Sequence, residues 1–168
     1  INHIDLLRRT SFLLNLRDSL IVAVGAVLLG LTLALPAAYA FSRFRFRGRQ
    51  VLRTQFLVIN MFPVVMLILP LFVLMRDLGL LDTYFALIGG HATFTLPFAI
   101  WLLTSYFEGI PVELDQAAMI DGATRAQALR LVVLPLAIPG VVAVGLYLFI
   151  TSWNEYLFAL MLTGRNVR

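Results

Sequence analysis

PVELDQAAMIDGATRAQALRLVVLPLAIP, residues 111–139, is the stretch around which the chain is organised. Pro111 suits the first turn of a helix, and acidic side chains follow it where they favour the positive end of the helix dipole. Gly122 can adopt the left-handed conformation that ends a helix, and residues 124–127 (TRAQ) fit a capping box that begins another. These signals predict a helix, a tight turn and a second helix. On these residues alone, the first helix fits a docking surface and an ordinary interfacial helix equally well.

Four long uncharged runs surround this stretch, at about residues 19–42, 54–75, 84–107 and 131–154. About 20 apolar residues cross a bilayer as a helix. The chain is 61% hydrophobic, well above the usual composition of a soluble domain. We therefore expect an all-α integral membrane protein with a bundle of about four transmembrane helices, and residues 108–130 as a loop between two of them.

The composition excludes several classes of site. The 168 residues include no cysteine, which rules out disulfides and thiolate metal sites, and we expect no metal site. They include no lysine either, so a P-loop ATPase site is excluded. The basic pI of about 10.1 is compatible with nucleic-acid binding, but the arginines cluster between apolar runs, where membrane topology explains them. We expect a lipid bilayer as partner and no nucleic acid.

Residues 42–53 read SRFRFRGRQVLR, with five arginines between positions 43 and 53. Arginine-rich loops beside a membrane span are typically cytoplasmic. Alternating Arg and Phe also fits a nucleic-acid-binding strand, but the position between two spans favours a loop that faces lipid headgroups. With four spans, residues 43–53 and 108–130 are then both cytoplasmic, and both ends of this chain lie outside.

Small residues recur every four positions in the first span, at Ala26, Gly30, Ala34 and Ala38. Small side chains on one face let membrane helices approach closely, so this face is predicted to pack against other helices.

A few polar side chains in or beside the spans are candidates for a solute pathway or an outer gate. They are Asn60, Thr151, Ser152, Asn154 and Glu155. Neutral hydrogen-bonding groups beside an aromatic such as Trp153 suit sugar hydroxyls and ring faces, but the same residues also fit helix interfaces or the membrane boundary.

The spacing in the central stretch resembles a known family. Residues 116–118 (QAA), three residues, Gly122, nine residues and residues 132–135 (VVLP) are similar to the EAA loop of ABC importer permeases, whose pattern is E-A-A, three residues, G, nine residues, I-x-L-P. Gln116 and Val132 depart from this pattern, and Gln116 lacks the charge of the family's glutamate.

Other segments resemble the maltose-type sugar permeases within that family, among them residues 36–43 (PAAYAFSR), 96–101 (LPFAIW) and 152–156 (SWNEY). The family usually has six helices. The resemblance therefore implies a single permease domain over residues 1–168 that lacks the family's first and last helices.

The resemblance implies a permease subunit of an ATP-driven, binding-protein-dependent importer for a sugar or related polyol, in the bacterial inner membrane. Such a subunit is not an enzyme and binds no cofactor itself. Its partners would be a second permease subunit in a heterodimer, two cytoplasmic ATPase subunits that hold ATP and Mg, and an extracytoplasmic solute-binding protein.

Within that family, the loop would be a coupling helix seated on the ATPase. The residues implied in this contact are Glu113, Asp115, Gln116, Ala117, Ala118, Asp121 and Gly122. One alternative is a permease for another solute, such as a polyamine or phosphate. A secondary transporter or channel is a further alternative, although such proteins usually carry carboxylates at the membrane midplane and the four uncharged runs have none.

Overall fold

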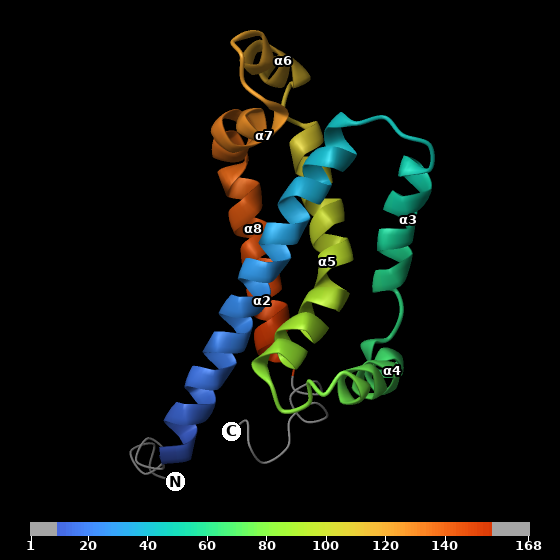
Figure 1. Cartoon of the computed structure of the whole chain (residues 1–168), viewed down its shortest axis with the longest axis vertical. Helices are drawn as coiled ribbons and strands as arrows, with labels where there is room; N and C mark the ends of the chain where they lie inside the picture. The colour runs from blue at the N-terminus through green and yellow to red at the C-terminus, as the bar shows by residue number, and fades with distance from the viewer. Residues whose placement is uncertain (1–9, 156–168) are drawn as a thin grey trace. The chain divides into compact units, whose positions relative to one another are not determined.

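The computed structural model describes residues 10–155, and within this range the chain is helical apart from short connections (Figure 1). The elements in order are α2 (Thr10–Arg43), α3 (Arg49–Asn60), α4 (Val64–Asp77), α5 (Tyr84–Glu108), α6 (Val112–Ile120), α7 (Arg125–Ala128), the π-helical turn η1 (Leu129–Val133) and α8 (Leu134–Asn154). The ends of the chain, whose position outside the cytoplasm was predicted, fall outside the described residues.

Three of the described helices are long and apolar enough to cross a membrane. They cover Asn15–Arg43, Tyr84–Glu108 and Arg125–Asn154, the last of which combines α7, η1 and α8. Helices α3 and α4 meet the same length and composition test only as a pair that is bent at its break, and they make a fourth span if this pair crosses as one. The expectation of an all-α protein with about four membrane spans is thus confirmed.

The span predicted at residues 54–75 differs from the prediction in one respect, because it is two helices rather than one. Helix α3 ends at Asn60, and α4 begins again after Pro63, which caps its first turn. Proline has no N–H to donate and disfavours helical geometry in the residue before it, so a helix breaks there. Pro70 lies inside α4 without ending it.

The chain divides into two compact units, and we describe each separately. The first comprises Ile1–Leu29, Phe62–Thr95 and Leu148–Arg168. Its core is an apolar cluster of Val22, Ile68, Leu71, Met75, Ala86 and Leu87. In the same unit, the Tyr84 hydroxyl donates a hydrogen bond of 3.0 Å to Asp18 Oδ1.

The second unit comprises Gly30–Met61 and Leu96–Tyr147 and contains the whole central stretch. Its core includes Leu103, Phe107, Val133 and Val144, which are 0–1% exposed. The short helices α6 and α7 lie at the same end of this unit, where α2 and α5 also end (Figure 1).

The small residues of α2 behave as the sequence predicts. Ala26, Ala34 and Ala38 are 0–2% exposed, and Gly30 is buried as well. The face they form is therefore a packing face.

A close approach in the second unit gives a test of this packing. A Cβ at Gly140 in α8 would lie 2.6–2.8 Å from three ring atoms of Tyr106 in α5. Gly140→Ala should therefore destabilise the protein by about 1–3 kcal/mol through overpacking, measured as thermal stability in detergent. Tyr106→Ala in the same chain should remove most of that loss.

Gly89→Ala in α5 is the matched control, because a Cβ there meets nothing within 4 Å. It should leave stability unchanged or raise it by up to about 1 kcal/mol. Equal losses at both glycines would contradict the described packing of α5 on α8.

Candidate functional site

Most of the surface of helix α6 is exposed. Along Val112–Ile120, Asp115 is the residue that is buried, at 2% exposure. Ile120, by contrast, is 85% exposed.

The end of α6 is fixed by its backbone. Gly122 N donates to Met119 O (3.1 Å) and Ala123 N donates to Ala118 O (3.0 Å), which together form a Schellman motif. Gly122 has a φ of 92°, in the left-handed region that favours glycine. The helix stop predicted at Gly122 is confirmed.

The following helix starts as predicted too. Thr124 N donates to Gln127 Oε1 (2.7 Å), and Gln127 N donates back to Thr124 Oγ1 (3.3 Å), so the capping box is confirmed. Helix α7 then passes through the π-helical turn η1 into α8. A π turn directly before Pro135 fits the loss of a backbone donor at that proline.

The single inward side chain of α6 is held by α2. Arg43 Nε lies 2.6 Å from Asp115 Oδ2, and the two side chains are 5% and 3% exposed. The Tyr39 hydroxyl donates to the same carboxylate oxygen at 3.3 Å. We call Tyr39, Arg43 and Asp115 the anchor.

The guanidinium of Arg43 also closes the end of α5. Its two terminal nitrogens donate to the carbonyl oxygens of Phe107 and Ile110, both at 3.1 Å. The last carbonyls of a helix have no partner within the helix, and a cation there also suits the helix dipole. One side chain thus joins the ends of α2 and α5 to α6.

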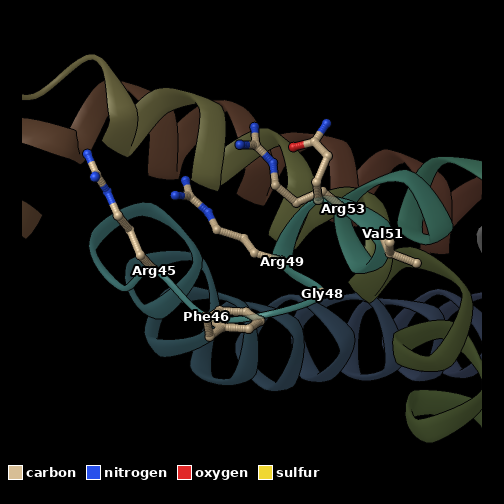
Figure 2. Close-up of a pocket in the computed structure, with 7 residues that line it drawn as sticks. Arg45, Phe46, Gly48, Arg49, Val51 and Arg53 are labelled. Atoms are coloured by element: carbon tan, nitrogen blue, oxygen red, sulfur yellow. The ribbon is translucent and has the colours of Figure 1, made fainter.

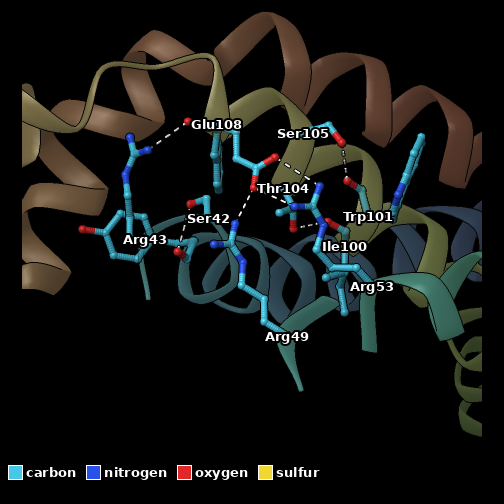
Figure 3. Close-up of polar contacts among 11 residues, drawn as sticks. Ser42, Arg43, Arg49, Arg53, Ile100, Trp101, Thr104, Ser105 and Glu108 are labelled. Atoms are coloured by element: carbon cyan, nitrogen blue, oxygen red, sulfur yellow. Dashed lines mark hydrogen bonds and ion pairs between the residues drawn. The ribbon is translucent and has the colours of Figure 1, made fainter. Parts of the chain in front are cut away.

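A second cluster of charges lies beside the anchor. Figure 3 shows the Glu108 carboxylate between the guanidinium groups of Arg49 and Arg53. Arg53 donates to both carboxylate oxygens, at 2.7 and 3.1 Å. These side chains are 19–34% exposed, so solvent weakens the pairs and they fix geometry more than they stabilise the fold.

The same close-up shows how α5 satisfies its own polar groups. Thr104 Oγ1 donates to Ile100 O at 2.6 Å, and Ser105 Oγ donates to Trp101 O at 3.1 Å (Figure 3). Hydroxyls that bond back to their own helix need no partner elsewhere. Thr104 is therefore buried with its hydroxyl bonded inside α5, and residues 10–155 offer it no polar partner on another helix.

Beside the second cluster lies an open hollow of about 470 Å³, lined by residues 45–53 except 47 and 52. Figure 2 shows the guanidinium groups of Arg45, Arg49 and Arg53 extending to the same side of the loop. Arg45 and Arg47 are exposed, and the described residues provide neither with an acidic partner.

The seven residues implied in an ATPase contact lie together on α6 and its turn. Their exposure separates them into two groups. Glu113, Gln116, Ala117, Asp121 and Gly122 are exposed, and Ala118 is partly buried. Asp115 is buried, so its carboxylate is placed to anchor α6 within the chain, and a direct contact with a partner stays a prediction.

The pathway candidates are divided between the two units, so their arrangement as one site stays a prediction. Asn60 belongs to the second unit, is exposed, and donates to Phe56 O of its own helix at 2.8 Å. Thr151, Ser152, Asn154 and Glu155 belong to the first unit. Among them, Ser152 is 7% exposed and its Oγ has no hydrogen-bond partner among the described residues.

Sequence reasoning missed the residues that hold α6. It explained the arginines of residues 43–53 by topology, whereas the structure pairs Arg43, Arg49 and Arg53 with carboxylates of other segments. A signal was present, since two loops predicted on the same membrane side carry opposite charges. That signal does not say which arginine meets which carboxylate.

These features define a membrane protein of several spans, with one short exposed helix, α6, at one end of the second unit. The chain matches the family model described as "binding-protein-dependent transport system inner membrane component" over residues 26–167. It therefore belongs to that family, whose members are transport components and not enzymes, and it is a multi-pass inner membrane component.

Among curated relatives, the chain is 43% identical over 143 residues to the inner membrane ABC transporter permease protein YcjP of Escherichia coli (strain K12), covering 85% of this chain and 51% of that protein. It is 41% identical over 163 residues to the trehalose transport system permease protein SugB of Mycobacterium tuberculosis (strain CDC 1551 / Oshkosh), covering 97% and 60%. The chain thus spans between half and two thirds of the length of these relatives.

The fold is also similar to a solved structure, that of a bacterial ABC transporter involved in the import of the acidic polysaccharide alginate. The TM-score is 0.85 with 34% sequence identity, and the match covers 97% of this chain and 57% of that one. The similarity to ABC importer permeases inferred from the EAA-type spacing is confirmed.

The anchor predicts a specific stability loss. Asp115→Asn would leave the buried Arg43 guanidinium without a counter-charge, which should cost about 3–5 kcal/mol. The expected readout is a lower melting temperature in detergent, with faster proteolysis within residues 108–130.

Asp121→Asn serves as the control for this variant, because it makes the same chemical change at an exposed position and should alter stability by less than about 0.5 kcal/mol. Adding Arg43→Gln to Asp115→Asn should recover part of the loss, since no unpaired charge then remains. If Asp115→Asn and Asp121→Asn have the same melting temperature, the protein does not form the anchor.

Proposed function

We propose that this chain is part of a permease subunit of an ATP-driven, binding-protein-dependent importer for a sugar or related polyol. Two relatives with a named solute, the trehalose permease and the alginate importer, support a carbohydrate. Other solutes, such as polyamines or phosphate, have no support from these two names. A secondary transporter or channel is the less favoured alternative, because the family is one of binding-protein-dependent transport.

One observation carries the coupling part of this proposal: most of α6 is exposed, and its one buried side chain, Asp115, belongs to the anchor. An exposed helix can contact a partner, and the anchor links that helix to the ends of α2 and α5. Packed helices move as discrete rigid units, so a displacement of α6 would be passed to the spans. We propose α6 as the coupling helix on this basis.

The proposed partners follow from this mechanism. Two cytoplasmic ATPase subunits would bind ATP with Mg, and their closure would move α6. A second permease subunit, in a heterodimer, would complete the pathway, and an extracytoplasmic binding protein would deliver the solute. Residues 43–53 and 108–130 would then be cytoplasmic and both ends of this chain outside.

In this proposal the outer side of α6 is apolar with few charges. Ile120 would insert into a groove of the ATPase, while Ala117 lets the two backbones approach closely. Glu113 and Asp121 would meet basic side chains at the rim. Gln116 would contribute hydrogen bonds without the charge that the family's glutamate carries.

The test uses the full-length subunit reconstituted with its partner permease, ATPase and binding protein. Ala117→Trp should lower solute-stimulated ATP hydrolysis and uptake by at least roughly tenfold, because a bulky side chain on a close-approach face prevents docking. The variant should still insert and melt normally, since Ala117 is exposed in the subunit.

Ala143→Trp is the matched control, an exposed alanine within α8 that lies outside α6. It should leave coupling intact. Normal uptake in Ala117→Trp would refute α6 as the coupling helix. Wild-type complexes that respond to a non-carbohydrate solute, and not to sugars, would refute the solute class alone.

A further inference from the structure

The arginines of residues 43–53 differ in what they do. Arg43 is buried in the anchor, and Arg49 and Arg53 share the carboxylate of Glu108. Arg45 and Arg47 are exposed and have no acidic partner among the described residues. Five cations thus meet two carboxylates, and positive charge remains on this loop and the hollow beside it.

The loop that carries this charge is also apolar. Phe44 and Phe46 alternate with the arginines and are each 40% exposed, and Val51 is 62% exposed. Phe46 and Val51 line the hollow together with Arg45 and Arg49. The lining is therefore amphiphilic, with cationic groups and apolar side chains around one space.

Neighbouring aromatic contacts hold the loop in place. The Phe41 ring meets Phe46 edge to face at 5.4 Å between centroids, and it meets Phe56 in the same way at 5.3 Å. The guanidinium of Arg125 lies 4.9 Å from the Phe44 ring centroid. These contacts tie the loop to α2, α3 and α7, so the hollow does not depend on a freely moving segment.

The location indicates the ligand. The loop starts directly after Arg43, the last residue of a span that is long and apolar enough to cross a membrane. The ends of spans lie at the level of lipid headgroups, and basic residues concentrate beside the cytoplasmic ends. A planar guanidinium matches the geometry of a phosphate group, and basic residues at this level attract anionic lipids.

We propose that this hollow binds an anionic phospholipid. Its phosphate would lie between the guanidinium groups of Arg45 and Arg49, and its glycerol and first acyl carbons would contact Phe46 and Val51. A free phosphate would leave the apolar wall unused, and a nucleic acid would not lie beside the end of a membrane span. The proposal depends on membrane insertion of the chain and not on the identity of the solute.

The test is native mass spectrometry of the assembled transporter with added phosphatidylglycerol as the probe. Arg45→Gln should weaken phosphatidylglycerol binding about fivefold, the usual contribution of one basic residue near a membrane surface. Arg45→Lys should retain most of the affinity because it keeps the charge. Arg45 is exposed and has no ion-pair partner in the part of the chain that the structure describes, so both variants should fold.

Arg130→Gln is the matched control, since it removes an exposed arginine from η1, outside the hollow. It should leave lipid binding unchanged. Equal effects of Arg45→Gln and Arg130→Gln, or no effect of either, would overturn the proposal. It would also be overturned if glycerol 3-phosphate displaced the lipid fully, or if Arg45→Gln released the ATPase subunit without changing lipid binding.

Discussion

The buried ion pair between Arg43 and Asp115 is the interaction on which the second unit depends. Taking both charges out of water is costly, and the cost is offset only where geometry is good and other hydrogen bonds are made. Here the guanidinium also donates to Phe107 O in the last turn of α5 and to Ile110 O just after that helix, and Tyr39 adds a donor to the carboxylate. The ends of two membrane helices and α6 therefore share one set of contacts.

This constraint explains how so short a helix is held. Helix α6 has 9 residues, and isolated helices shorter than about 12–15 residues are marginal in water. Its fold depends on Pro111 before it, the Schellman motif after it, and the anchor between them. Because those contacts use a single inward side chain, most of the remaining surface of α6 stays exposed.

The sequence predicted the features that arise from local physics. Hydropathy placed the spans, and turn chemistry placed Gly122 and the capping box at Thr124. The break at Pro63 was not predicted, since Pro70 gives the same local signal and stays inside α4. The anchor was not predicted either, because its two charged residues lie 72 positions apart and several arginines and carboxylates were available to pair.

The turn after α6 restricts the backbone conformation of its central residue, and not the size of the side chain there. Gly122 has a φ of 92°, yet a Cβ built there would meet nothing within 4 Å. The obstacle to an L-residue is thus the backbone conformation and not crowding. A D-alanine, whose mirror-image preference suits positive φ, should fit this turn without strain. Glycine suits the position because it is achiral, and not because it is small.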